Sequence, residues 1–353
     1  MHFHSKELRS SSLIIFLLMI FLVLFTFTAI LSLSQSGKDI TSSFSSDSPT
    51  ESNGSKEEIE SISSFLQEIT DIFADGFDIR EVETVMPVSV PEGYGAVIET
   101  TRDIKGDIIS ADEMLSITNK TLSAAEIDID RLMSKYPVTP VSSPTVIIYH
   151  THTSEGYEKN ANEYYPLGKS GVTENEALSV TAVGEALKAR LENYGINVIH
   201  IKDSFDSPSR SGSFKRSAAA VMKAAENKNV ALVIDLHRGI LVQTGGDRIK
   251  PTVYCNGRKA AQIGLISCYD KDGTLGCPGW ESNLSLSLSL SRELNSFSPL
   301  LTLPVSLESQ KYNLYLPYPC IMTEIGTDVN TIEEAKLSAI LLGDAIASLI
   351  CIS

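Results

Sequence analysis

Blocks of apolar residues alternate with amphipathic stretches through the second half of the chain. Continuous apolar runs predict buried strands, whereas apolar residues three and four positions apart predict helices with one buried face. The two kinds of block follow each other in turn from residue 145 onward, which is typical of an α/β domain. The predicted strands are 145–149, 196–201, 230–237 and 319–326, and the predicted helices are 176–194, 213–228 and 331–351.

One segment carries two conflicting signals. Leucine and serine alternate strictly from Ser285 to Ser291, and a period of two residues predicts a strand. The flanking Glu281 and the polar residues from Arg292 onward are more typical of a helix. Pattern and context therefore disagree at this point of the chain, and the residues alone leave both alternatives open.

An uncharged apolar run occupies residues 12–33. At about 1.5 Å per residue in a helix, such a run spans the roughly 30 Å hydrocarbon core of a bilayer. Lys6 and Arg9 precede the run and the next basic residue is Lys38, so the positive-inside rule predicts a cytoplasmic tail (1–11) and an extracytoplasmic remainder. A cleaved signal peptide is the alternative, but its apolar region is normally shorter and no good cleavage site follows. We therefore expect a retained single-pass anchor in the cell membrane.

Three further segments are expected after the anchor. Residues 34–56 are rich in Ser, Gly, Asp and Thr and predict a flexible linker. Apolar residues at helical spacing predict an amphipathic helix at about 57–74, which could pack on the main domain or on a partner. Short apolar runs broken by prolines make 57–140 a helical or irregular lead-in, and the main domain is expected at 141–353.

The charge and composition of the chain limit the classes of partner that we expect it to bind. The formal net charge is −15 and no stretch interleaves basic and aromatic residues, so a nucleic-acid partner is not expected. The five cysteines show no CxxC spacing and their number is odd, so we interpret them as small buried apolar residues, although an extracytoplasmic domain would permit a disulfide.

Two of the predicted strands end on histidine. His150, His152 and Glu155 follow the strand at 145–149, and His237 ends the strand at 230–237. Imidazoles and a carboxylate are ligands that zinc prefers, and open α/β sheets place their sites beyond the carboxyl ends of strands. We therefore predict a zinc site built from these four residues. Alternate positions of a strand point the same way, so His150 and His152 would lie on one side of it, and the residues leave open which of the two is the ligand.

Glu324 lies within an apolar predicted strand, where a carboxylate is costly unless it is paired or has a chemical role. In a zinc hydrolase it would be the general base that takes a proton from water. For any one of these residues, a hydrogen-bonded buried polar group is the simpler interpretation. A Ser154, His237 and Asp235 triad is a further alternative, but the sequence lacks a Gly-x-Ser-x-Gly motif.

Several motifs together resemble the stage II sporulation protein P family, which are membrane-anchored cell-wall hydrolases of endospore-forming bacteria. The resemblance covers roughly 105–350, with the motifs in the family's order. The matching segments are 115–121, Ile148–Glu155, 183–187, 194–200, Gly212–Ser217, Val233–Arg238, Asn256–Gln262, Tyr312–Asn313, Thr323–Gly326 and Asn330–Ala335.

The resemblance implies a three-layer, zinc-dependent N-acetylmuramoyl-L-alanine amidase fold. It implies cleavage of the amide between N-acetylmuramic acid and L-alanine in peptidoglycan, and also cleavage of peptide cross-links. It further implies action with stage II sporulation proteins D and M at the sporulation septum, on the forespore membrane during engulfment. The Leu-Ser repeat would then be a helix.

Residue by residue, the resemblance implies a role for each matching position. The metal ligands would be His150 or His152 with Glu155 and His237, and Glu324 would be the catalytic acid and base. The same motifs suggest three substrate-binding residues, which are Arg216, Arg238 and Asn313.

Two positions depart from the family pattern. Gly239 stands where an acidic residue usually follows the His-Arg pair, and Leu314 stands where a glutamine tends to follow Tyr312-Asn313. These departures support an alternative function, in which the protein is a catalytically weakened wall-binding scaffold. Such a scaffold would recruit a partner glycan-cleaving enzyme through the 57–74 helix.

Overall fold

The computed structural model describes residues 90–102, 108–112, 114–121, 126–207, 209–243 and 246–351. Residues 87–353 form one compact unit. The predicted cytoplasmic tail, membrane anchor, linker and 57–74 helix lie outside the described residues. None of the helices in the described part combines the length and the hydropathy that a bilayer crossing requires.

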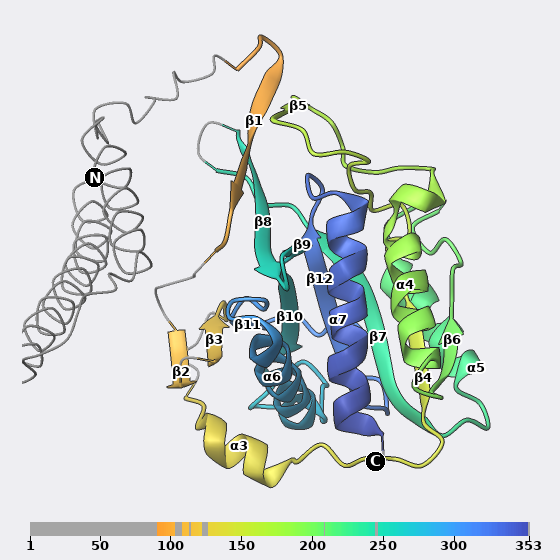
Figure 1. Cartoon of the computed structure of the whole chain (residues 1–353). Helices are drawn as coiled ribbons and strands as arrows, with labels where there is room; N and C mark the ends of the chain where they lie inside the picture. The colour runs from red at the N-terminus through yellow and green to blue at the C-terminus, as the bar shows by residue number, and fades with distance from the viewer. Residues whose placement is uncertain are drawn as a thin grey trace, which may run out of the picture. The chain divides into compact units, whose positions relative to one another are not determined.

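A mixed sheet of eight strands forms the centre of the described part of the chain (Figure 1). Its order is β2 (Ile108–Asp112), β3 (Leu115–Asn119), β11 (Val305–Glu308), β10 (Ile263–Cys268), β12 (Cys320–Thr327), β7 (Val230–Gly239), β4 (Thr145–Tyr149) and β6 (Asn197–His200). Only the β2–β3 and β10–β12 neighbours are antiparallel. The predicted α/β domain is therefore confirmed, and its large sheet is mostly parallel.

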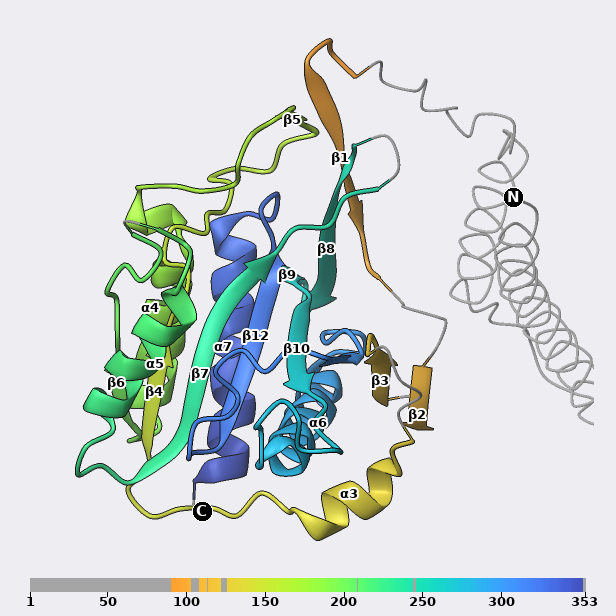
Figure 2. The ribbon, with the colours of Figure 1, turned by 180° about the vertical axis from the view of Figure 1, so that it is seen from behind.

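Helices cover both faces of this sheet. They are α3 (Ile129–Lys135), the short 3₁₀ helix η1 (Glu176–Leu178), α4 (Val180–Glu192), α5 (Ser213–Ala224), α6 (Trp280–Phe297) and α7 (Ile332–Ile350). Figure 1 shows α4 and α7 in front of the sheet, whereas Figure 2 shows α5 on the opposite face. Because side chains alternate along a strand, Ile148 of β4 packs into the core beneath α4 and α7, and Ile147 packs into the core beneath α5.

The Leu-Ser repeat forms α6 and not a strand. Its leucines and most of its serines are buried, because the helix contacts β10, α3 and α7 on different sides. The serine hydroxyls have partners: Ser285 Oγ donates to the carbonyl of Tyr136 (2.7 Å), and the Oγ of Ser291 lies 2.7 Å from Thr302 Oγ1. A helix buried on several sides has no single apolar stripe, so its residue period carried no helical signal.

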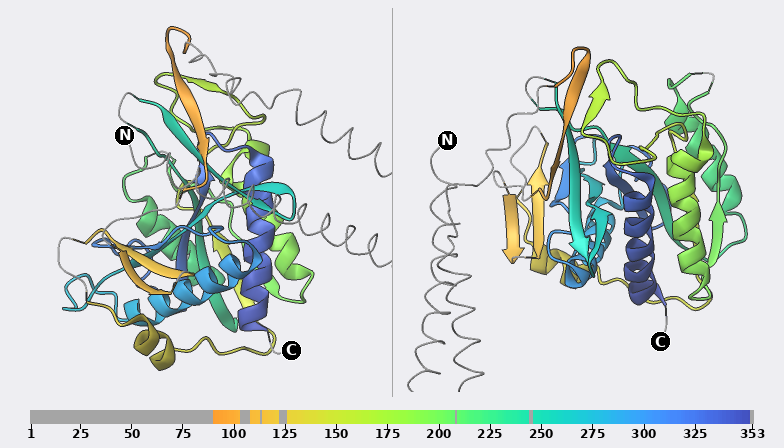
Figure 3. Two further views of the ribbon diagram at one scale, coloured as in Figure 1. Left: turned by 60° about the vertical axis from the view of Figure 1, so that its left-hand side comes forward. Right: turned by 45° about the horizontal axis from the view of Figure 1, so that its top comes forward.

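A second sheet contains four strands in the order β5 (Tyr164–Pro166), β1 (Tyr94–Thr100), β8 (Arg248–Cys255) and β9 (Arg258–Ala261). Figure 3 shows β1 and β8 side by side. The sequence predicted a helical or irregular lead-in over 57–140. The described part of that range instead contains strands: β1 joins this sheet, while β2 and β3 join the large one. Each of these strands is short and β1 pairs with a strand about 150 residues away, so its local sequence does not reveal the pairing.

The carboxyl ends of β4, β7 and β12 meet at one edge of the large sheet, because these three neighbours are parallel. The register places Tyr149 opposite Asp235 and His237 opposite Glu324. Two of the predicted site residues, His237 and Glu324, are therefore adjacent across two strands, and the loop after β4 is the third component of the same edge.

Candidate active site

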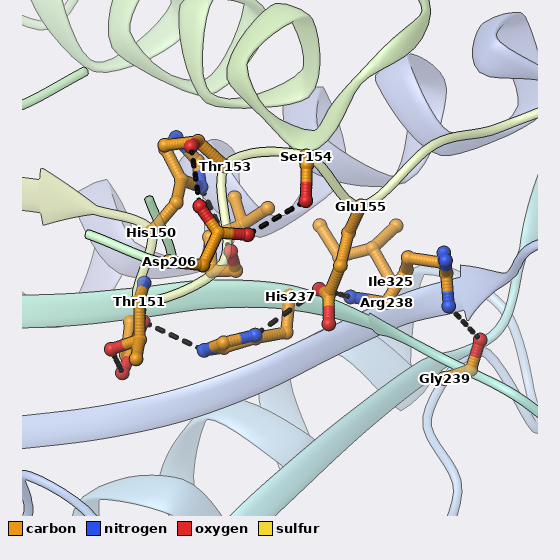
Figure 4. A network of polar contacts seen from close by, with 12 residues as sticks. His150, Thr151, Thr153, Ser154, Glu155, Asp206, His237, Arg238, Gly239 and Ile325 are labelled. Atoms are coloured by element: carbon orange, nitrogen blue, oxygen red, sulfur yellow. Dashed lines mark hydrogen bonds and ion pairs between the residues drawn. The ribbon is translucent and has the colours of Figure 1, made fainter. Parts of the chain in front are cut away.

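His237 lies at the centre of this edge and is held between two carboxylates (Figure 4). Its Nδ1 donates to Glu155 Oε2 at 3.1 Å, and its Nε2 lies 2.8 Å from Asp235 Oδ1 in an ion-pair contact without hydrogen-bond geometry. Burial lowers the pKa of His237, but the charges of Asp235 and Glu155 outweigh that effect and raise its pKa well above the ordinary value. The two carboxylates therefore favour the protonated, cationic form of this buried imidazole.

Glu155 is fixed by the loop that follows β4. Its Oε2 also accepts a hydrogen bond from the backbone N–H of Arg238 at 3.1 Å. The guanidinium of Arg238 donates to the carbonyls of Gly156 (3.0 Å), Gly239 (3.2 Å) and Gly171. The structure thus places Arg238, a predicted substrate-binding residue, in a buried position where it joins the β4 loop to the end of β7.

A chain of buried hydrogen bonds holds Asp235 beside the imidazole. Thr151 donates to Asp235 through both its backbone N–H (3.0 Å) and its hydroxyl (2.7 Å). The Thr151 hydroxyl also lies 3.0 Å from Ser217 Oγ on α5, which accepts a hydrogen bond from Asn313 Nδ2 at 2.9 Å. The predicted residue Asn313 therefore reaches His237 through three intervening side chains.

His152 lies on the α5 side of the sheet edge. Its ring centroid is 5.6 Å from that of His237 and 5.9 Å from that of Phe214 on α5. Its Nδ1 is buried and makes no hydrogen bond within the described part of the chain. Burial lowers the pKa of His152, which favours the neutral imidazole that can bind a metal.

His150 lies on the other face of the sheet and has no exposed surface. Its Nδ1 is 2.8 Å from the carbonyl oxygen of Leu236, and its Nε2 is 2.8 Å from His200 Nε2. Burial beneath α4 lowers the pKa of His150 to about 3. Gly184 of α4 is required there, because a Cβ on it would lie 2.8 Å from His150 Nε2 and 2.6 Å from His200 Nε2. Both ring nitrogens of His150 are therefore already used.

The residues on the α5 side suit a zinc ion by type and by unused bonding capacity. Neutral imidazole nitrogen and carboxylate oxygen are its usual protein ligands. His152 Nδ1 is a buried nitrogen without a partner, and it lies beside the His237–Glu155 pair. Among the described residues, no three His, Cys, Asp or Glu side chains converge on one point at metal-binding distance. The reason is visible at His237, whose two nitrogens contact carboxylates directly.

Glu324 lines a cavity of about 290 Å³ that adjoins the sheet edge. Burial raises the pKa of its carboxyl, opposed by the nearby His237 and reinforced by Glu155. A carboxyl of this kind can carry a proton nearer to neutral pH than an exposed glutamate. Gly239 gives it room, because a Cβ at that position would lie 3.2 Å from Glu324 Oε2. The other departure, Leu314, is buried in the core beneath α5.

The two remaining suggestions have clear positions. Arg216 of α5 donates from Nε to the carbonyl of Phe205 (2.9 Å) and from Nη1 to that of Ser211 (3.0 Å), so it fixes the preceding loop. Ser154 Oγ donates to Asp206 Oδ2 at 2.6 Å, and the structure shows no bond from it to His237. The serine-protease-like triad is therefore not assembled.

Sequence reasoning missed three residues of the site. His200 is the partner of His150, and its own Nδ1 lies 2.8 Å from Glu185 Oε1. Asp206 accepts hydrogen bonds from the loop that carries His152. Tyr312 has a φ of +46°, which is rare outside glycine and turns its ring into the cavity beside Glu324. His200 ends β6, but the sequence pattern placed it inside the predicted strand 196–201, and Asp206 lies in a loop without a metal-ligand spacing. Backbone strain at Tyr312 leaves no mark in the sequence.

Comparison with protein families decides the membership of the chain. The family model of stage II sporulation protein P matches residues 93–347. The chain belongs to the stage II sporulation protein P family. The matched range includes β1 to β3, so the family's domain begins well before residue 141 and agrees with the compact unit seen in the structure. No curated protein matches the chain.

Solved structures with a similar chain path are amidases. The CwlD amidase from Clostridioides difficile, solved with the GerS lipoprotein, is 14% identical, with 58% of this chain and 98% of that chain covered and a TM-score of 0.34. The N-acetylmuramyl-L-alanine amidase Ami1 from Mycobacterium smegmatis is 10% identical (60% and 98% covered, TM-score 0.35). The catalytic domain of CwlV from Bacillus (Paenibacillus) polymyxa is 12% identical (58% and 97%, TM-score 0.32). Likeness at this level bears on neither substrate nor mechanism.

Proposed function

We propose that this member of the stage II sporulation protein P family is a peptidoglycan hydrolase. It cleaves the amide between N-acetylmuramic acid and L-alanine, and also peptide cross-links, with zinc as its cofactor. The observation that carries the proposal is the buried Nδ1 of His152, which has no hydrogen-bond partner among the described residues and lies beside the His237–Glu155 pair, one strand away from Glu324. A buried polar atom without a partner is costly, and binding a ligand there would remove that cost.

His152, His237 and Glu155 would hold the zinc ion, and His150 would support the fold. When bound, zinc supplies Lewis acidity toward a substrate carbonyl and toward water. Asp235 holds the His237 ring in orientation, and the hydrogen bonds from Thr151 hold Asp235 in turn. Arg238 keeps Glu155 in place by tying the backbone of its loop to β7.

Glu324 is the group that would move the proton. Its carboxylate takes a proton from the attacking water and, as the carboxylic acid, returns it to the nitrogen of the leaving amine. Burial raises its pKa, so both forms are accessible nearer to neutral pH. The cavity that it lines provides the space in which the peptide side of the bond is received.

The cellular setting is part of the proposal. The apolar run at 12–33 and the Ser-rich linker at 34–56 would tether the domain outside the cell membrane and let it reach the wall. Family membership supports a role in septal wall remodelling and engulfment during sporulation, with stage II sporulation proteins D and M as partners.

The test is release of stem peptide from purified peptidoglycan by the full-length protein in detergent. We expect release that a chelator stops and added zinc restores, and that Glu324→Gln abolishes at unchanged thermal stability. A matched control is Glu308→Gln, which removes another carboxylate from the same cavity. Wall binding without release under any metal would instead support the catalytically weakened scaffold that recruits a glycan-cleaving partner. The glycine at position 239 is the sequence feature that favours this alternative.

A further inference from the structure

The cavity that contains Glu324 also holds a cation that forms no ion pair with any of the described residues. Its charged lining residues are Arg102, Lys120, Glu308 and Glu324. Lys120 Nζ pairs with Glu308 Oε1 at 3.2 Å, and Glu308 Oε1 also accepts from Ser306 Oγ at 2.7 Å. These two charges therefore satisfy each other.

Arg102 has no such partner. It is half-buried at the end of β1, and within the described residues its guanidinium makes no hydrogen bond or ion pair. Among the described residues, burial is the one cause that shifts the pKa of Arg102, which it lowers, and no carboxylate there opposes that shift. The guanidinium nevertheless stays charged at neutral pH, so a half-buried positive charge faces the cavity.

The backbone at Arg102 is held firmly. The side-chain amide of the buried Gln262 accepts from the Arg102 N–H (2.8 Å) and donates to its carbonyl (3.0 Å). Thr101 Oγ1 donates to the carbonyl of Thr252 on β8 at 2.7 Å. A guanidinium placed by a clamped backbone loses less freedom when it binds a ligand.

A second, independent group in the cavity also lacks a partner. The hydroxyl of Thr118 on β3 is buried and makes no hydrogen bond within the described part of the chain. An arginine and a hydroxyl donor together suit an anion with several acceptor oxygens, and the fork of a guanidinium matches a carboxylate in particular. In a chain of net charge −15, an unpaired cation in this place is not part of a general basic surface.

We propose that the cavity is a subsite for an acidic peptide, in which Arg102 and Thr118 bind a carboxylate of the peptide while its scissile end lies at Glu324. This inference rests on the proposed function and sharpens it. It makes the carboxylate-bearing stem peptide, and not the glycan, the part of the substrate that the cavity recognises.

The test measures binding, so that it does not depend on turnover. The full-length Glu324→Gln protein in detergent is titrated with a soluble muropeptide that has free carboxylates and with the same muropeptide after amidation of those carboxylates. We expect the free form to bind roughly tenfold or more tightly than the amidated form, as a charged hydrogen-bonded pair predicts. Adding Arg102→Gln should remove the preference, and Arg102→Lys should restore part of it.

The control is Arg258→Gln, which removes an exposed arginine on β9 outside the cavity and should leave the preference intact. Competition by inorganic phosphate separates a carboxylate site from a general anion site. Phosphate would block a general anion site as effectively as the free muropeptide does. Equal binding of both muropeptides by the parent, or an unchanged preference in Arg102→Gln, would overturn the inference. If the wild-type protein released no stem peptide in the earlier experiment but the carboxylate preference were found here, the proposed function alone would be overturned.

Discussion

His150 and His152 are two residues apart at the end of the same strand, yet the sheet separates their environments. On the α4 face, both nitrogens of His150 have partners and its side chain is completely buried. On the α5 face, the Nδ1 of His152 is buried and has no hydrogen-bond partner in the part of the chain that the structure describes, and it lies next to a histidine between two carboxylates. The comparison teaches that unused bonding capacity, and not position after a strand, separates a candidate ligand from a structural histidine.

The largest effect on hydrolysis is expected from Glu324, the proposed proton-transfer group. Glu324→Gln keeps the size of the side chain but removes the group that accepts a proton. Hydrolysis of peptidoglycan should fall by about 10²- to 10⁴-fold, the range typical of a lost general base. The thermal midpoint should stay close to that of the wild type, because Glu324 makes no side-chain hydrogen bond with described residues. Retained hydrolysis would remove Glu324 from the mechanism.

The two histidines should give opposite results when each is changed to alanine. His150→Ala removes the contacts that its ring makes with the carbonyl of Leu236 and with Nε2 of His200, and should lower the free energy of unfolding by about 2–5 kcal/mol. His152→Ala removes a ring nitrogen, Nδ1, that makes no hydrogen bond with any described residue, so stability should change little while hydrolysis falls by roughly 100-fold or more. Chemical denaturation and peptide release, measured on both variants, check this. A stability loss for both with equal residual activity would contradict the comparison.

A smaller effect is expected from the hydrogen bonds that hold Asp235. Thr151→Val preserves shape but removes the hydroxyl that donates to Asp235 Oδ2 at 2.7 Å. We expect the rate to fall by roughly tenfold, because groups that orient a ligand typically contribute about 10- to 100-fold. Thr153→Val is the matched control, since its hydroxyl has only a 3.4 Å contact with Asp206. Equal rates for the two variants would show that this network does not position His237.

The smallest effect concerns charges far from both histidines. Lys250 is buried and pairs with Glu99 (3.1 Å) and Glu334 (2.8 Å). Burial raises the pKa of Glu99, but Lys259 and Lys250 outweigh it and lower its pKa below 4.5. A depressed carboxyl pKa adds stability above the unfolded-state value, and this stability is lost as pH falls through the folded-state value.

Glu99→Gln should therefore lower the thermal midpoint slightly at pH 7, and the difference from wild type should vanish as the pH falls below about 4.5. Midpoints measured from pH 7 to 3 test this, and hydrolysis at pH 7 should be unchanged. A difference that grows on acidification would mean that the sign of the Glu99 contribution is reversed.

Strong periodicity allowed much of the fold to be predicted. The strands β4, β7 and β12 and the helices α4, α5 and α7 agree with their sequence patterns. Thr331 caps α7, and its side chain and that of Glu334 form a capping box. The strands β1 to β3 were not predicted, because β1 and β3 pair with strands far away in the chain and β2 is a short edge strand that pairs with β3. The residues of the Leu-Ser repeat left strand and helix open, and the family resemblance favoured the helix, which α6 confirms. Its period of two gave no helical signal because the helix is buried on several sides.

The candidate site was predicted in its members but not in its geometry. His237, Glu155 and Glu324 come together as strand ends and register require. His150 and His152 were expected on one side of an extended segment, but β4 ends at Tyr149 and the chain then turns. The turn places one histidine on each face, and it depends on tertiary hydrogen bonds such as that from the Thr151 backbone to Asp235. No local pattern of residues records such a contact.

The most direct test of the account is the zinc content of full-length protein, His150→Ala and His152→Ala after metal removal and equilibration with zinc. We predict one bound zinc per chain in the wild type and in folded His150→Ala, and an affinity lower by roughly 100-fold or more in His152→Ala. Zinc retained by His152→Ala and lost from folded His150→Ala would contradict the assignment of the α5 face as the metal-binding side.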